Sequence, residues 1–172
     1  EYEAGNLNAS LPHFRNYVVH HGEDVEVHDI LFDIYRRQNN ETMALEEAQT
    51  LIKLRPEEEG PYHYLFEHLK DKGDYEKIIV IMEKSFKTNP SQTAFREYLV
   101  LSYLQTGKEK LAAGQMEEIL KVRPEDFNLW LHLAKLKEKL GDKAKALEAY
   151  KRVVEISPGN EEAEEAYLRL RL

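Results

Sequence analysis

Residues 127–160 read FNLWLHLAKLKEKLGDKAKALEAYKRVVEISPGN. In the first part, Trp130 and Leu133 belong to an apolar stripe at three- and four-residue intervals, which predicts one face of a helix. Gly141 ends that helix, because glycine adopts the left-handed conformation of a helix C-terminus without steric cost. A second helix follows and closes at Pro158, which cannot donate the next backbone hydrogen bond. The stretch therefore predicts an antiparallel pair of helices joined by a tight turn.

The same landmarks recur upstream at a spacing of 34 residues. The closing prolines are Pro56, Pro90, Pro124 and Pro158, the turn residues are Asn39, Gly73, Gly107 and Gly141, and the first-helix leucines are Leu31, Leu65, Leu99 and Leu133. A slim residue stands where the two helices must approach closely, at Ala44, Ile78, Ala112 and Ala146. The spacing predicts four helix pairs, at residues 25–58, 59–92, 93–126 and 127–160.

This pattern resembles the tetratricopeptide repeat family, whose unit is a 34-residue helix-turn-helix with a closing proline. The resemblance implies an all-α protein, an α-solenoid that winds antiparallel helix pairs into a right-handed superhelix. The departures are local. His28 and Arg96 replace a large residue of the family's pattern, and Lys137 replaces the tyrosine that Tyr35 and Tyr103 supply.

The flanking segments are expected to be parts of the same array. Residues 1–24 read as the end of a truncated repeat, with residues 1–4 closing its first helix and residues 10–20 forming its second. Ser10 is the expected N-cap of that second helix, which places Pro12 in the first turn, where proline is tolerated. Residues 161–172 are expected to form a capping helix with a solvated face. A missing first helix would make this chain a fragment of a longer protein.

Composition excludes several classes of function. The formal net charge of -8 argues against nucleic acid as the main partner, because phosphate binding needs clustered lysine and arginine. The chain has no cysteine, which excludes disulfides and thiol chemistry. It has no apolar run of the length that spans a membrane and nothing like a signal peptide, so direct membrane insertion is not expected. The compartment stays unknown, with the cytoplasm weakly favoured.

No chemical site is predicted. Neighbouring histidines are spaced wrongly for one helix face, as at His63 and His68, so no metal site is expected. His28 is expected to be a partly buried structural residue. The chain lacks the common nucleophile and phosphate-loop motifs, so we expect neither an enzyme nor a cofactor.

Two local features have alternative readings. The β-branched run at residues 78–81 could be a strand, but the repeat period favours a helix. Gly114 lies inside a predicted helix and marks either tolerated drift or the close approach of another backbone.

The resemblance also implies a peptide-binding groove, lined by a second stripe on each first helix. Transferred to this chain, the groove residues are Asp29, Asp33, His63, Glu67, Lys70, Glu97, Leu101, Leu104, Leu131, Lys135 and Lys139. Acidic residues stand at its start and lysines at its end. The ligand is expected to carry basic residues, an apolar anchor and an acidic group in that order.

The three leucines of this stripe are the sharpest functional signal, because large apolar residues stand where solvent favours polar ones. They either form a binding surface or fill the joint between the third and fourth repeats, and the sequence leaves both readings open. The predicted function is a scaffold or adaptor that binds a protein or peptide partner in the groove. The alternative is a homo-oligomer formed through the N-terminal end, centred on Phe14, Tyr17 and Val18.

Overall fold

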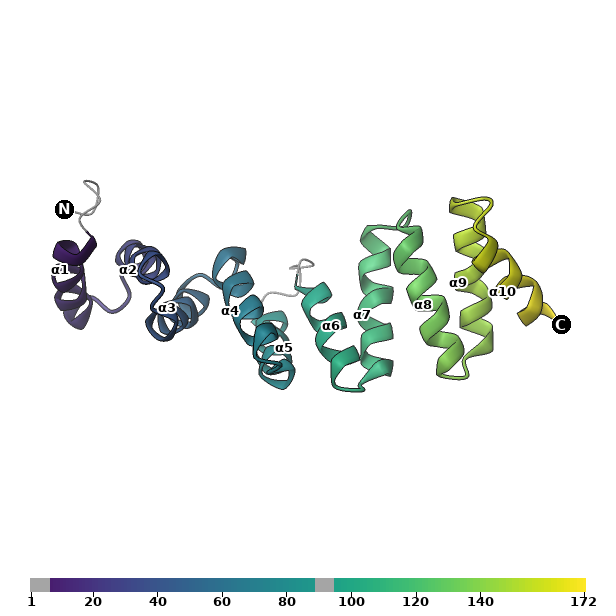
Figure 1. Cartoon of the computed structure of the whole chain (residues 1–172), viewed down its shortest axis with the longest axis horizontal. Helices are drawn as coiled ribbons and strands as arrows, with labels where there is room; N and C mark the ends of the chain where they lie inside the picture. The colour runs from purple at the N-terminus through teal and green to yellow at the C-terminus, as the bar shows by residue number, and fades with distance from the viewer. Residues whose placement is uncertain (1–6, 89–94) are drawn as a thin grey trace. The chain divides into compact units, whose positions relative to one another are not determined.

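The structure is a computed structural model that describes residues 7–88 and 95–172. These residues form ten helices and no strand (Figure 1). The helices are α1 Leu7–His20, α2 Val25–Arg37, α3 Glu41–Leu54, α4 Glu59–Asp71, α5 Tyr75–Thr88, α6 Arg96–Gln105, α7 Glu109–Val122, α8 Phe127–Lys139, α9 Lys143–Ile156 and α10 Glu161–Arg171. The predicted all-α repeat architecture is confirmed.

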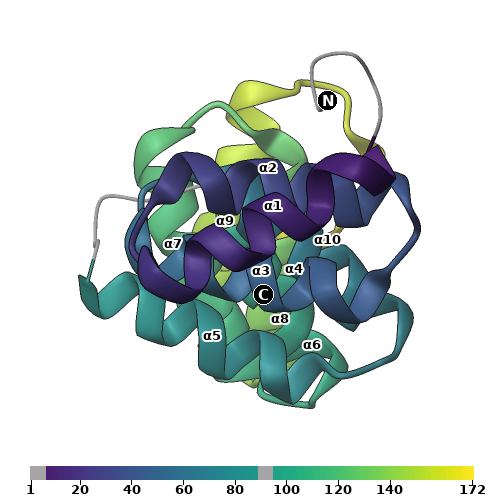
Figure 2. The same ribbon diagram turned by 90° about the vertical axis from the view of Figure 1, so that its left-hand side faces the viewer.

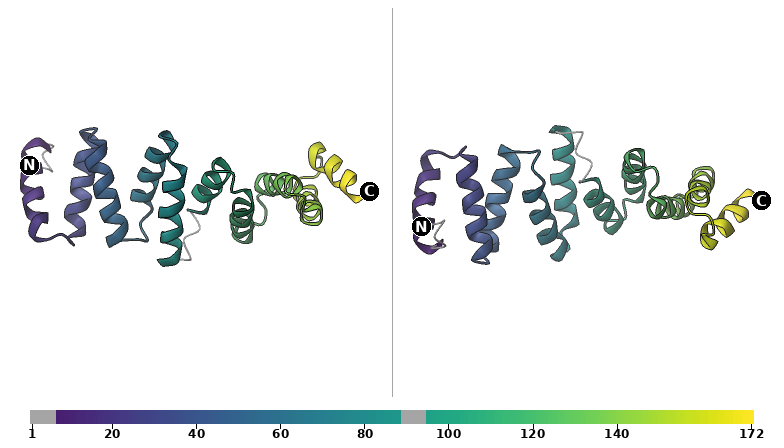
Figure 3. Two further views of the ribbon diagram at one scale, coloured as in Figure 1. Left: turned by 90° about the horizontal axis from the view of Figure 1, so that it is seen from below. Right: turned by 90° about the horizontal axis from the view of Figure 1, so that it is seen from above.

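The helices fall into two compact units. Helices α1 to α4 with the end of α5 form the first, and the beginning of α5 with α6 to α10 forms the second. Within the units, successive helices pack as antiparallel pairs, α2 with α3, α6 with α7 and α8 with α9 (Figure 3). In the first unit α1 also packs against α2 (Figure 2).

The turn inside each helix pair has one recurring geometry. Its central residue has a positive φ, which is 53° at Asn39, 71° at Gly73 and Gly107, and 78° at Gly141. The next backbone N–H reaches back over the turn, as from Asp142 to the carbonyl of Lys137 at 2.9 Å. These bonds satisfy carbonyl groups that the helix end leaves unpaired. The predicted left-handed conformation is confirmed at all four positions.

Each unit has its own apolar core. In the first, α2 and α3 bury Leu31, Phe32, Tyr35, Ala44, Ala48 and Leu51. In the second, α8, α9 and α10 bury Ala134, Ala146, Ala149, Tyr150, Val153, Ala163 and Ala166. The slim residues at the helix contacts, Ala44, Ala112 and Ala146, are fully buried, as their positions in the repeat predict.

Helix α1 begins earlier than the sequence predicts. It starts at Leu7, so Ser10 lies inside it, 3% exposed, and the prediction of Ser10 as the N-cap is wrong. Pro12 consequently lies in the helix interior. The capping rule fails because one proline removes a single intrahelical hydrogen bond, whereas packing against a neighbouring helix supplies most of a helix's stability. The predicted end of a first helix at residues 1–4 lies outside the described residues.

The two ambiguous segments are resolved. Residues 78–81 belong to α5, so the helical prediction is confirmed. A Cβ atom added at Gly114 would meet no atom within 4 Å, so no backbone approaches this glycine closely. The open space around Gly114 favours the first reading, in which glycine here is a tolerated variation of the repeat sequence.

Lys137 is buried although it carries a charge. Its side chain lies in α8 where the first and third complete repeats have tyrosine, with 8% of the residue exposed. Its ammonium group lies 2.6 Å from the carboxylate of Glu117 on α7. A buried charge needs such a partner, so this pair accommodates the departure from the repeat pattern.

Candidate binding site

The second unit contains an open pocket between α6, α7 and α8, with a volume of about 370 Å³. Its apolar lining comes from Val100, Leu101, Leu104, Met116, Ile119 and Leu129, and its polar lining from Glu97, Arg123, Asp126, Asn128 and His132. Apolar walls with a few polar groups are typical of binding pockets, and the volume lies at the lower end of their range. Three of the predicted groove residues, Glu97, Leu101 and Leu104, meet here.

Helix α6 leaves two leucines at this pocket. Its buried face is formed by Leu99, Ser102 and Tyr103, which pack into the unit. Leu101 is half-buried, and Leu104 is 38% exposed. An exposed apolar side chain gains free energy when it is buried, so a partner that covers these leucines would be stabilised by that burial.

Arg123 organises the charge at the pocket. It extends from the C-terminal end of α7 and donates a hydrogen bond to Glu97 on α6. It also lies 4.0 Å from Asp126, whose carboxylate accepts the Leu129 backbone N–H at 3.0 Å as the N-cap of α8. Two carboxylates thus face one guanidinium group, which leaves this edge of the pocket with a net negative charge.

The predicted groove residues on α2 and α4 are engaged within the first unit. Asp29 is paired with Arg55, and Asp33 lies 2.9 Å from Arg37. Glu67 is paired with Lys70. His63 is exposed. Arg55 also lies 2.8 Å from Glu58, so two carboxylates share that guanidinium group. The acidic charges expected at the start of the groove are therefore partly neutralised by neighbours, which reduces their attraction for a basic ligand.

The predicted lysines on α8 are paired in the same way. Lys135 lies 2.6 Å from Glu162 on α10, and Lys139 is paired with Glu109 on α7. Leu131, on the same helix, packs against the core cluster of α8, α9 and α10. The structure thus separates the three leucines, because only Leu101 and Leu104 line the pocket.

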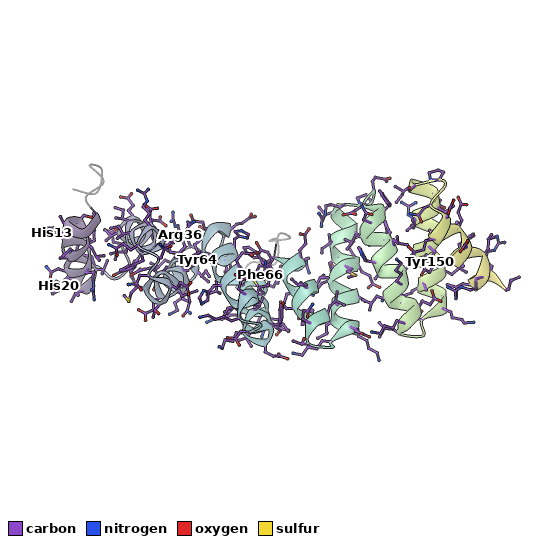
Figure 4. The ribbon with its side chains drawn as sticks, viewed as in Figure 1. His13, His20, Arg36, Tyr64, Phe66 and Tyr150 are labelled. Carbon is purple, nitrogen blue, oxygen red and sulfur yellow. The ribbon has the colours of Figure 1, made fainter. Side chains whose placement is uncertain are left out.

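The place in α2 to α4 that corresponds to this pocket, two 34-residue periods earlier, is filled by aromatic side chains. Phe32 on α2 meets Tyr64 on α4 edge to face, with ring centroids 5.1 Å apart. The guanidinium carbon of Arg36 lies over both rings, at 5.3 Å from the Phe32 centroid and 5.5 Å from that of Tyr64. Arg36 and Tyr64 are labelled in Figure 4. Sequence reasoning missed this cluster because Phe32 and Tyr64 lie outside the stripe taken from the family. A position-by-position comparison of the repeats would have found it.

A second pocket, of about 390 Å³, lies between α7, α8 and α9. Charged side chains make up much of its lining, which consists of Glu117, Leu120, Lys121, Trp130, Leu133, Lys137, Lys145, Glu148 and Ala149. Glu117 there lies 2.6 Å from Lys137 and 3.5 Å from Lys145. These ion pairs hold the helices together, so the leucine-lined pocket is the better candidate for a partner.

Two of the three side chains predicted to drive self-association through the N-terminal end are packed within the first unit. Phe14 and Val18 are half-buried and pack against the core cluster of α2 and α3. Tyr17 is exposed and stacks on His21, with ring centroids 4.2 Å apart. Self-association through this end stays a prediction.

His28 has the structural role that the sequence predicts. Its Nδ1 lies 2.6 Å from Oε2 of Glu47 on α3, and its Nε2 lies 3.1 Å from the carbonyl oxygen of Gly22. In residues 7–88 and 95–172, no three metal-ligating side chains cluster in a way that could hold a metal ion. Nor is any helix in the described part long and apolar enough to cross a membrane.

The helix pairs and their recurring turns define an all-α helical-repeat protein with a solenoid fold. A family model described as tetratricopeptide repeat matches residues 98–161, in agreement with the family predicted from the sequence. No curated protein is similar enough in sequence to match the chain.

Solved structures of tetratricopeptide repeat proteins have the same fold. A MamA protein is 17% identical, with a TM-score of 0.62 over 87% of this chain and 81% of that one. MamA from Desulfovibrio magneticus RS-1 is 16% identical, with a TM-score of 0.60 over 86% and 93%. YrrB, a tetratricopeptide repeat protein described as having an unusual peptide-binding site, is 13% identical, with a TM-score of 0.60 over 96% and 85%. At these identities the likeness shows the fold alone.

Proposed function

We propose that this protein is an adaptor or scaffold that binds a segment of another protein in the pocket between α6, α7 and α8. The observation that carries the proposal is the placement of Leu101 and Leu104 in an open, apolar pocket. Tetratricopeptide repeats generally mediate protein–protein interactions, and the peptide-binding site of YrrB is a precedent on the same fold.

Apolar contacts are expected to supply most of the affinity. The charged side chains predicted to set the register of a ligand already have partners in this chain, as at Asp29, Lys135 and Lys139. Exposed ion pairs contribute about 0 to 1 kcal/mol each, whereas buried apolar anchors contribute about 2 kcal/mol or more. A partner segment therefore gains more from the leucines than from the groove charges.

Site-specific crosslinking tests the proposal. Leu104 is replaced by a photo-crosslinking, diazirine-bearing amino acid in cells that make the protein, and the adducts are identified by mass spectrometry. The matched control carries the same group at Val80, which is 65% exposed on α5 and outside the pocket. We expect a defined protein segment at position 104 and no such adduct at position 80. The same adducts at both positions would contradict the proposal.

Mutations separate the binding leucines from the packing leucine. Leu101→Ser with Leu104→Ser should weaken binding of the captured segment by about 2 kcal/mol, roughly thirtyfold. Leu131→Ser should instead lower the melting temperature, because Leu131 packs against the core cluster of α8, α9 and α10. Calorimetry measures the first effect and circular dichroism the second. Equal loss of binding in both variants would show that the leucines affect binding through the stability of the fold and not through contact with the partner.

A further inference from the structure

We infer that the pocket between α6, α7 and α8 selects a partner segment in which an aromatic residue, phenylalanine or tyrosine, is followed by a basic residue. The inference rests on the proposed function and specifies the occupant of that same site. It comes from the corresponding place in α2 to α4, where this chain's own side chains show what fills the site.

The two places correspond residue by residue. Helices α3 and α7, and likewise α4 and α8, begin two 34-residue periods apart. An ion pair recurs at the same positions, Asp29 with Arg55 in the first unit and Glu97 with Arg123 in the second. The side chains around the two sites can therefore be compared one for one.

The second site lacks one ring and one cation of the first, and a smaller imidazole replaces the second ring. Val100 stands where α2 has Phe32, and His132 stands where α4 has Tyr64. Leu104 replaces Arg36. In the first unit the two rings meet edge to face and the guanidinium group lies over both. In the second unit the smaller side chains line the pocket of about 370 Å³.

An aromatic ring suits the shape and chemistry of this pocket. A volume at the lower end of the range for binding pockets accepts an anchor side chain, not a whole folded segment. A ring that enters it would contact Leu101, Leu104 and Ile119, and its edge would face His132 in place of the missing edge-to-face pair. Aromatic residues are also the side chains that most often dominate such contacts.

Charge favours a basic residue beside the ring. Glu97 and Asp126 border the pocket with two carboxylates against the single guanidinium group of Arg123. A lysine or arginine of the partner would offset the remaining negative charge and would lie over the ring, as Arg36 lies over Phe32. The partner would then reproduce the arrangement of Phe32, Tyr64 and Arg36.

Short peptides test the selectivity directly. The probes are acetyl-Ala-Phe-Arg-Ala-amide and two versions in which leucine replaces phenylalanine or glutamate replaces arginine. Methyl NMR of the full chain follows Leu101, Leu104, Met116 and Ile119. We expect shifts centred on these methyl groups, with affinity for the leucine peptide about five- to tenfold lower and for the glutamate peptide about threefold lower. Equal affinity for the phenylalanine and leucine peptides would overturn the inference.

Filling the pocket provides the matched variant. Val100→Phe with His132→Tyr copies the rings of the first unit. This double variant should lower the affinity for the phenylalanine–arginine peptide, followed by the methyl shifts, at least about tenfold. Its circular dichroism spectrum should remain that of the parent. Val80→Phe adds a ring on exposed α5 and should leave binding unchanged. If the double variant does not fold, Leu104→Arg places a cation where α2 has Arg36, and should weaken the arginine peptide more than the glutamate peptide. A filled variant that still binds the peptide would contradict the inference.

The outcomes distinguish this inference from the proposed function. A partner captured at position 104 without an aromatic preference overturns the inference and leaves the function standing. Absence of both a captured segment and any peptide-induced shift overturns the function itself. Crosslinks that join two copies of this chain would make the occupant a second copy, and would also overturn the inference.

Discussion

Helices α2 to α4 and helices α6 to α8 use the same positions in different ways. In the first region Phe32, Tyr64 and Arg36 close the site with a packed aromatic cluster. In the second, Val100, Leu104 and His132 leave it open. The backbone repeat is common to both, so a few side chains decide whether a repeat stabilises the fold or receives a partner.

The same contrast extends to the joint between the two helices of each pair. His28 and Glu47 lie 2.6 Å apart between α2 and α3, and both residues are buried. The corresponding side chains of α6 and α7 are Arg96 and Gln115, joined by a hydrogen bond of 2.7 Å. The first region thus buries more of its polar groups, and mutations there should have larger effects.

Opening the filled site should have the largest effect on stability. Phe32→Val with Tyr64→His copies the open site into the first unit, and should cost about 3 kcal/mol from lost burial and ring contact. Amide hydrogen exchange should show the loss in α2 to α4, because repeats interact mainly with their neighbours. Val100→Phe with His132→Tyr in the second unit is the reciprocal control. An equal loss of protection in α8 to α10 would show that the array unfolds as one unit.

Removing a partner at the joint should have the next largest effect. Glu47→Ala leaves the buried His28 without its carboxylate partner, and should cost about 2 kcal/mol. Gln115→Ala should cost less than about 1 kcal/mol, because Arg96 is only half-buried and can reach water. Urea unfolding of the two variants compares these values. Similar losses would mean that burial of the pair does not set its contribution.

Two buried tyrosines at the same repeat position should respond differently to loss of the hydroxyl. Tyr103 donates a hydrogen bond to Glu83 at 2.6 Å, whereas the Tyr35 hydroxyl has no hydrogen-bond partner among the described residues. Tyr103→Phe should cost about 1 kcal/mol, and Tyr35→Phe should be neutral or slightly stabilising. Thermal unfolding measures both. A larger loss at Tyr35 would indicate a partner that the described residues do not include.

The Tyr103 hydroxyl should also give stability a dependence on alkaline pH. Burial and the hydrogen bond to Glu83 raise the pKa of Tyr103 above its ordinary value of 10.0. The unfolded chain then loses this proton at a lower pH than the folded chain, so the contribution is complete below pH 10 and falls as the pH rises further. The parent should lose more stability than Tyr103→Phe as the pH rises from about 10 to about 12. Parallel curves would exclude this contribution.

The turn residues should give the smallest effect. Asn39 has a φ of 53° where Gly107, two periods later, has 71°. Asn39→Gly should stabilise the chain by about 0.5 kcal/mol by relieving left-handed strain, and Gly107→Asn should destabilise it by a similar amount. Melting temperatures give both values. A loss of stability in Asn39→Gly would mean that the asparagine side chain supports the turn.

The fold could be predicted from the sequence because its signals are local and repeated. Proline, glycine and leucine at fixed positions specify the turn and the helix contact in each repeat, and Gly73, Gly107 and Gly141 have the predicted φ. The start of α1 could not be predicted, because packing against α2 outweighs the cost of Pro12 inside the helix.

The candidate site could be predicted only in part. Leu101 and Leu104 were found because they are apolar where the family's stripe is solvated, and both line the pocket. Leu131 has the same signal but packs against the core of α8 to α10, a distinction that depends on tertiary contacts. The ion pairs of Asp29 with Arg55 and of Lys139 with Glu109 could not be predicted either, since each partner lies on another helix or at a helix end.

The ion pairs of α6 and α8 bear on how fast a partner would associate. Glu97, Lys135 and Lys139 each face an opposite charge on this chain. Paired charges act at a distance as dipoles, so they attract an approaching molecule only weakly. Only the excess negative charge at Glu97 and Asp126 then remains to steer a basic partner. The association rate constant should therefore stay near the unsteered value of about 10⁵ to 10⁶ M⁻¹s⁻¹ and change only moderately with ionic strength. Differences in affinity between partners would then be expressed in the lifetime of the complex.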